Sequence, residues 1–203
     1  MDSVEQGTVV GAGVTGFQIA TVALVGRWLI KRFSLSPADG WVIRWLIYDC
    51  LTYSLLMIPI VVISLQGPLN ESDSVFAIVG KDYARADARF GVSDPCTVAG
   101  NLGGVLLSLP LAAAIIYGIC QASPWRHVVQ VAHCAVELYG CFMIFVPEWI
   151  IGSPSLNTSD PLLLCFHLVF MNMLWIIIPG ALLVQSWQHI SAACSVAAKE
   201  KTA

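Results

Sequence analysis

The sequence predicts an all-α membrane protein, a bundle of five transmembrane helices, from its composition and its apolar stretches. Of its 203 residues, 57% are hydrophobic and only 11% are charged, and the mean hydropathy is +0.77. Average soluble domains are about 45–50% apolar and about 25% charged. Ten Lys and Arg residues are also too few for a nucleic-acid-binding surface. A soluble enzyme and a nucleic-acid binder are therefore both excluded.

The first two spans are joined by a short basic turn. Residues 7–26 carry no charge and are followed by a group of basic residues that begins at Arg27. Acidic rather than basic residues precede this span, which argues against a signal peptide. The second span, 41–66, is apolar except for Arg44 near its start and Asp49 deeper inside. Both stretches reach the about 20 residues that a transmembrane helix needs.

A polar segment, residues 67–95, separates the second span from the third. Apolar residues are mixed there with charges, and Lys81, Arg85 and Arg89 recur at near-helical spacing. We expect a short helix that lies across the mouth of the bundle. The alternative is a solvated run of charges without a fixed structure.

The remaining three spans follow in quick succession. Residues 96–123 contain no charge, residues 127–147 are interrupted only by Glu137, and residues 161–187 are again uncharged. Each of them is long enough to cross a bilayer as a helix. The chain therefore crosses five times, and its two ends lie on opposite sides of the membrane.

Basic residues gather on one side of this five-span arrangement. They are Arg27, Lys31, Arg32, Arg44, Arg126, Lys199 and Lys201. Because cytosolic loops are enriched in Lys and Arg, we expect a lumenal N-terminus, a lumenal segment 67–95 and a cytosolic C-terminus. The Asn-x-Ser/Thr sequons at Asn70 and Asn157 then fall in lumenal loops. The final Lys-Glu-Lys resembles a dilysine retrieval signal, which favours the endoplasmic reticulum membrane.

The sequence predicts neither a metal site nor a cofactor. Its seven cysteines lie mostly inside apolar stretches and show no CxxC spacing, which argues against a zinc site or a disulfide framework. The GxGxxG letters at residues 11–16 open a membrane span instead of following a strand. We interpret those glycines as helix-packing positions.

Ionisable side chains inside the membrane are costly, so each of them suggests a function. Asp49 and Tyr53 lie on one face of the second span, and His133 and Glu137 lie along one stripe of the fourth. We expect these faces to line a polar cavity. The alternative is that each residue only hydrogen-bonds a neighbouring helix. Further polar or aromatic residues of this kind are Asn101, Asn172 and Trp175.

Several short motifs resemble the emopamil-binding protein (EXPERA) family, and most closely its emopamil-binding-protein-like branch. They include WLIYD at 45–49, ELYGC at 137–141, FVPEW at 145–149 and FMNMLW at 170–175. The resemblance spans residues 41–188, in matching order and spacing. It divides the chain into an N-terminal transmembrane helix with a cytosolic turn (1–40), an EXPERA-type four-helix membrane domain (41–188) and a cytosolic tail (189–203).

The resemblance implies a helical bundle in the endoplasmic reticulum with a sterol-sized cavity open to the bilayer. It also implies sterol Δ8–Δ7 isomerisation, in which an acid protonates a ring double bond and a neighbouring carbon of the carbocation then loses a proton. Such an enzyme is an intramolecular oxidoreductase that moves C=C bonds. Its partners would be a sterol or triterpenoid-like lipid, cationic amphiphilic amines that mimic the cation, and the bilayer, with a homo-oligomer as an option.

The family's site residues carry over only in part. In active isomerases the helix that corresponds to the second span of this chain carries a His and, one turn later, a Glu. This sequence has Tyr53 and Met57 at those positions. An acidic residue of the third helix falls at Asn101, and a nearby Thr falls at Gly104. The Asn and Trp of the fifth helix remain. The resemblance thus assigns substrate binding to Tyr53, Met57, Asn101, Asn172 and Trp175.

Two functions follow from these residues. The first is a double-bond isomerase whose acid has moved to Glu137, with His133 as proton relay and Asp49 as the next candidate. Burial in hydrocarbon disfavours a charged carboxylate, which is the condition that a proton donor requires. The second is a non-catalytic module that binds sterols or amines and has lost the isomerase acids.

Overall fold

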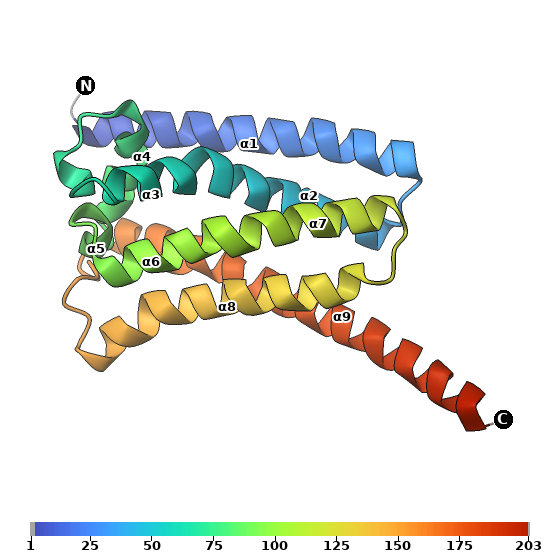
Figure 1. Ribbon diagram of the computed structural model, residues 1–203. Coiled ribbons are helices and arrows are strands. Elements are labelled where there is room, and N and C mark those ends of the chain that lie inside the picture. Colours follow the sequence, from blue (N-terminus) through green and yellow to red (C-terminus); the bar gives the residue numbers. More distant parts are fainter. Residues whose placement is uncertain (1–2, 203) are drawn as a thin grey trace.

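The computed structural model describes residues 3–202, which form a bundle of membrane-length helices with the two chain ends at opposite ends of the bundle (Figure 1). The structure is 84% helical and has no strands among these residues. Five helices are long and apolar enough to cross a membrane. The predicted all-α bundle of five spans is therefore confirmed. The helical segments that form the spans are α1 (Ser3–Phe33), α2 (Pro37–Thr52), η1 (Tyr53–Met57), α3 (Ile58–Ser64), α6 (Pro95–Gly103), η4 (Gly104–Ser108), α7 (Leu109–Cys120), α8 (Arg126–Ile150), η5 (Leu163–Phe170) and α9 (Met171–Thr202).

Three of the spans contain a π-helical segment, and in two of them, at η1 and η4, a proline explains it. In η1 the N–H of Ile58 bonds the carbonyl of Tyr53, five residues earlier, and Pro59 follows. In η4 the N–H of Leu109 bonds the carbonyl of Gly104, and Pro110 follows. Proline has no N–H and clashes with the carbonyl four residues before it, so the helix widens there instead of keeping α-helical bonds.

The segment between α3 and α6 covers one end of the bundle, which we call the capped end. It contains η2 (Leu69–Glu71), η3 (Val75–Ala77), α4 (Ile78–Ala84) and α5 (Ala88–Gly91) instead of one short helix. The expected ordered structure is present, but Lys81 and Arg89 lie on different helices. The chain turns between α4 and α5, where the side chain of Asp87 accepts a hydrogen bond from the N–H of Arg89 and caps α5.

The opposite end, which we call the open end, carries the α1–α2 and α7–α8 turns. Ser36 caps α2, and Arg126 at the start of α8 forms a 2.6 Å ion pair with Asp39. The last span extends further than the hydropathy predicted, because α9 continues past Trp187 to Thr202. The end of α9 runs beyond the other helices (Figure 1). The segment predicted as a tail is thus helical as far as Thr202.

The largest buried core lies between α2, α7, α8 and α9. Ile43, Leu46, Ile115 and Cys134 are among its members, and each of these is fully or almost fully inaccessible to solvent. Contacts between α8 and α9 and between α2 and α7 hold these helices together around this core. The polar residues described next lie against it, so they lie in an apolar and dry environment.

Candidate active site

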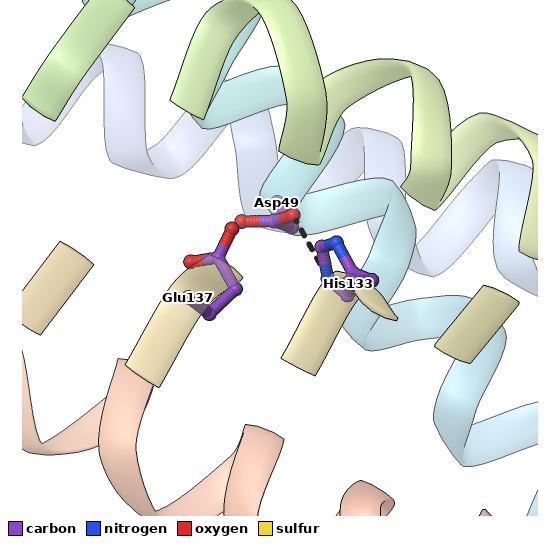
Figure 2. Close-up of side chains that lie close together, drawn as sticks. All are labelled: Asp49, His133 and Glu137. Atoms are coloured by element: carbon purple, nitrogen blue, oxygen red, sulfur yellow. Dashed lines mark ion pairs between the residues drawn. The ribbon is translucent and has the colours of Figure 1, made fainter. Parts of the chain in front are cut away.

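Three ionisable side chains meet in the middle of the bundle. Asp49 comes from α2, and His133 and Glu137 come from α8 (Figure 2). One ligand-type atom of each residue lies within 4.8 Å of the corresponding atoms of the other two. The exposed fractions are 0%, 0% and 4%, respectively, so water has almost no access to them. The three catalytic candidates from the sequence are therefore neighbours.

The local helical geometry explains why these residues converge. His133 and Glu137 are four residues apart on α8, so both project from one face of this helix. Asp49 lies on the part of α2 that packs in the same core as Ile43 and Leu46. Figure 2 shows the carboxylates of Asp49 and Glu137 facing each other, with the His133 ring beside Asp49. Nε2 of His133 is 3.6 Å from Oδ2 of Asp49.

Each carboxylate also accepts a hydrogen bond from an aromatic residue. The hydroxyl of Tyr53 donates to Oε1 of Glu137 at 3.0 Å, and Nε1 of Trp175 donates to Oδ1 of Asp49 at 3.1 Å. Trp175 also packs edge-to-face against Trp45, with their ring centroids 5.4 Å apart. Two packed tryptophans therefore lie next to Asp49.

Tyr53 reaches Glu137 because residue 104 has no side chain. A Cβ atom built at Gly104 would overlap the Tyr53 ring and hydroxyl. Gly104 opens the π-helical turn η4, and this turn lies against the π-helical turn η1 that carries Tyr53. The close approach of the two turns thus positions the Tyr53 hydroxyl in the site.

The carboxylates have no permanent counter-charge. Neither Asp49 nor Glu137 forms an ion pair with a lysine or arginine in the described part of the chain. Two like charges this close cannot both persist outside water, so such a pair retains a proton. Two facing carboxylates without such a partner therefore form a pair that could share one proton.

Histidine and carboxylate groups are also ligands for divalent cations. In this site Tyr53 and Trp175 already donate to one oxygen of each carboxylate. A retained proton neutralises the pair without any further group. We therefore interpret Asp49, His133 and Glu137 as proton-handling groups.

The structure does not bring all the expected substrate-binding residues to this cluster. The side-chain amide of Asn172 donates to the hydroxyl of Tyr83 in the capped end, at 3.1 Å, and to two backbone carbonyls of its own helix. Burial raises the pKa of Tyr83 to about 12, so its hydroxyl stays neutral. Met57 packs beside the small core formed by Ile60, Leu69 and Ala77.

Sequence reasoning missed several polar partners inside the bundle. Gln18 of α1 is buried and donates to Thr52 of α2, which links the first two spans. His127 is only 7% exposed and stacks on His189 with ring centroids 4.3 Å apart. Helical spacing could have placed His127 beside the stripe of His133 and Glu137, since it lies three residues before Gln130, which is itself three residues before His133.

An apolar cavity of about 230 Å³ begins one turn from Glu137. Its wall is formed by Ile176 of α9 and by one side of α8, with Leu138, Cys141, Phe142, Phe145, Val146 and Trp149. Drug-sized ligand pockets occupy about 300–1,000 Å³, so this groove holds part of a lipid rather than a whole sterol. It offers an apolar surface beside the acid pair.

Comparison with known proteins identifies relatives of this chain. The EXPERA (expanded EBP superfamily) profile matches residues 75–186. A probable 3-beta-hydroxysteroid-Delta(8),Delta(7)-isomerase of Oryza sativa subsp. japonica is 30% identical, over 84% of this chain and 78% of its own length. The 3-beta-hydroxysteroid-Delta(8),Delta(7)-isomerase of Mus musculus is 27% identical, over 64% of this chain and 57% of its own length. Protoglabretal synthase of Ailanthus altissima is 22% identical, over 89% and 82%, respectively. This chain belongs to the EXPERA superfamily, the family of the emopamil-binding proteins.

Proposed function

We propose that this protein is a double-bond isomerase of a sterol or triterpenoid-like lipid in the endoplasmic reticulum membrane. The observation that carries the proposal is the Asp49–Glu137 pair, two facing carboxylates without a lysine or arginine partner in the described residues. Its relatives include proteins named sterol Δ8–Δ7 isomerases. A protonated acid held outside water is the group that alkene protonation requires.

The reaction moves one proton onto the lipid and takes one proton from it. The protonated carboxyl of Glu137 gives its proton to one alkene carbon, whose π electrons form the new C–H bond. The other alkene carbon becomes a cation. A C–H bond then breaks on the carbon next to this cation, on the side away from the protonated carbon, and its electrons form the shifted double bond. Asp49 or Glu137 accepts that second proton, with His133 beside Asp49 as the relay. Atoms and charge balance without a cofactor.

The lipid would meet the site through its aromatic residues and the apolar groove. An indole face attracts a cation by about 0.5–2 kcal/mol, most when water is absent, which suits Trp175 beside a carbocation or a bound amine. Tyr53 would contact the reacting ring. Met57 and Asn172 lie away from the acid pair. Together with Asn101 they would contact the remainder of the lipid.

The orientation follows the distribution of basic residues. The open end carries Arg27, Lys31, Arg32 and Arg126, and we place it in the cytosol with the C-terminus, which leaves the capped end in the lumen. A tag fused to the C-terminus should be digested by protease added to sealed microsomes. Protection of that tag would reverse the orientation.

The decisive experiment is conversion of a Δ8-sterol by the purified full-length protein in lipid nanodiscs. We expect Δ7-sterol as product, and Glu137→Gln should lower turnover by about 10²–10⁴-fold, the usual contribution of a general acid. Glu71→Gln, an exposed change of the same chemistry in the capped end, is the matched control and should be neutral. Growth of cells that lack their own sterol Δ8–Δ7 isomerase tests the same variants in a membrane.

Three results would contradict parts of the proposal. A wild type that binds the sterol but neither converts it nor rescues the cells would be a binding module. Full activity of Glu137→Gln would keep the enzyme and move the acid, with Asp49→Asn as the next variant. Loss of activity in Glu71→Gln as well would show that the readout follows folding rather than chemistry.

A further inference from the structure

A second cavity lies at the open end, towards the opposite end of α8 from the apolar groove. It has a volume of about 730 Å³ and is bounded by the α1–α2 turn, the α7–α8 turn and the extension of α9. His127 and His189 form part of its wall, as do Asp39 and Arg126. The cavity is open to solvent, because His189 is exposed at its edge. The stacked rings of His127 and His189 therefore connect solvent with the interior of the bundle.

A polar stripe on α8 leads from this cavity to the acid pair. His127, Gln130, His133 and Glu137 follow one another at spacings of three, three and four residues, so they share one face of the helix. Their exposed fractions are 7%, 0%, 0% and 4%, although each is a polar side chain. With a rise of about 1.5 Å per residue, the ten residues from His127 to Glu137 span about 15 Å.

Part of this stripe is fastened to α9. His127 Nδ1 lies 3.3 Å from the hydroxyl oxygen of Ser186, and the amide of Gln130 donates to the carbonyl of Leu182 and to Oε1 of Gln185, each at 3.0 Å. These contacts explain why His127 and Gln130 are buried. They do not explain His133, which forms no such contact with α9.

Four of the buried polar atoms that lack a hydrogen-bond partner among the described residues lie along the same line. They are Oε1 of Gln130, both ring nitrogens of His133 and Oδ2 of Asp49. Buried groups of this kind are usually satisfied by internal waters, each of which makes about three hydrogen bonds. Waters held by such atoms, combined with imidazole rings that can both accept and release a proton, have the chemistry of a proton path.

We propose that His127, Gln130 and His133, with bridging waters, pass protons between the cavity at the open end and the Asp49–Glu137 pair. The inference rests on the proposed function, because it concerns the acid of that site. The path equilibrates the stored proton with solvent, whereas the lipid enters from the apolar side. Protons and substrate thus reach the same carboxylates by separate routes. His127 and Gln130 are positioning and relay residues and do not touch the substrate.

The experiment measures hydrogen–deuterium exchange of the buried carboxylic acid and does not require turnover. The protein in nanodiscs is transferred from H₂O to D₂O, and infrared spectroscopy follows the carbonyl stretch of protonated carboxyl groups. The band that disappears in Glu137→Gln belongs to the acid pair. We expect fast exchange of that band in the wild type. Gln130→Met and His127→Phe should slow it at least about tenfold, since the first removes the amide oxygen that would hold a bridging water and the second removes a ring that can carry a proton.

Two further variants separate a proton path from simple helix packing. Imidazole fits the open cavity, and adding it should restore exchange in His127→Phe, which no purely structural role predicts. His167→Phe is the matched control, because His167 pairs with Asp82 in the capped end and lies outside the path. Equal slowing in His167→Phe, or slowing in His127→Phe that imidazole does not restore, would overturn the path.

The outcomes also distinguish this inference from the proposed function. Exchange that stays fast in both Gln130→Met and His127→Phe overturns the path and leaves the isomerase proposal standing. A wild type without any carboxylic-acid band that Glu137→Gln removes overturns both, because no proton is then stored. A stored proton and slowed exchange without sterol turnover would support the path and reject the isomerase.

Discussion

The capped end and the middle of the bundle both bury two acidic residues near one basic residue, yet they treat the charge differently. In the capped end, Asp87 and Glu148 are 0% and 2% exposed, and Arg89 lies 2.6 Å from the first and 3.5 Å from the second. Arg89 also donates to the carbonyl of Ile144, and Glu148 accepts from the N–H of Ser155. The charges of this cluster are permanent and well partnered.

The middle of the bundle offers a histidine where the capped end offers an arginine. Arginine is always charged and its planar guanidinium matches carboxylates, which suits a structural clamp between loops. Histidine can lose its charge, so Asp49 and Glu137 must balance their charge with a proton instead. The comparison indicates that the cation beside a buried acid decides whether the acid stabilises the fold or can take part in proton transfer.

The largest effect on stability is expected when the ion-pair cluster of Asp87, Arg89 and Glu148 in the capped end is disrupted. Arg89→Met leaves Asp87 and Glu148 buried without a cation, and removing one partner of a buried ion pair costs about 3–5 kcal/mol. Accumulation in the membrane and thermal unfolding in detergent measure this loss. Arg85→Met is the control, because Arg85 forms a half-exposed ion pair with Asp82, and surface pairs contribute about 0–1 kcal/mol. If the two variants lowered stability equally, the buried cluster would have no special structural role.

The next prediction displaces Tyr53 without touching an ionisable residue. Gly104→Ala puts a Cβ into the Tyr53 ring, and such overpacking typically costs about 1–3 kcal/mol. We expect lower stability and lower turnover, and Tyr53→His in the same chain should relieve the overlap. Gly103→Ala is matched to it, since a Cβ at Gly103 meets nothing within 4 Å. If both alanine variants lower stability and turnover to a similar extent, general helix packing and not the overlap with Tyr53 would be the cause.

A smaller effect is expected where the capped end meets α9. Tyr83→Phe removes the hydrogen bond from Asn172 and should cost about 1 kcal/mol. Because burial raises the pKa of Tyr83 from 10.0 to about 12, its contribution is complete below pH 10 and is lost as the pH rises towards 12. The difference in unfolding free energy between wild type and Tyr83→Phe should therefore shrink above pH 10. A constant difference would contradict this dependence.

The smallest expected effect on stability is that of Glu137→Gln, and it tests the contrast between the central pair and the capped end most directly. Glu137→Gln keeps an acceptor for the Tyr53 hydroxyl and removes a carboxyl that has no cation, so folding should change by less than about 1 kcal/mol. Asp87→Asn, the same chemical change in the capped end, weakens the pairing with Arg89 and should destabilise the fold more. Thermal unfolding of the two variants side by side measures this contrast. A larger loss for Glu137→Gln would mean that the central pair is structural.

The five spans could be predicted because the bilayer requires long apolar stretches, and hydropathy detects them. The end of α9 could not be predicted in this way, because residues after Trp187 are small and polar and form a helix without an apolar stretch. The capped end also differs from the prediction. The spacing of Lys81 and Arg89 suggested one helix, but the turn at Asp87 directs Arg89 inwards to an ion pair.

The acids of the site could be predicted because ionisable residues are rare inside membranes. Helical spacing placed His133 and Glu137 on one face, and we expected the face of Asp49 and Tyr53 to line the same cavity. Spacing alone could not give the individual contacts, Tyr53 with Glu137 and His133 with Asp49. The family resemblance grouped Met57 with Tyr53, four residues earlier. The π-helical turn η1 lies between these two residues and adds a residue to the turn, so Met57 packs towards the capped end.

The contact between Tyr53 and Gly104 gives a different meaning to two departures from the isomerase pattern. Active isomerases, which this chain resembles, have a histidine at the position of Tyr53 and a threonine at that of Gly104. Because any Cβ at residue 104 would overlap the Tyr53 ring, the larger residue on one helix requires the smaller one on the other. The two departures are thus a single exchange of volume between neighbouring helices.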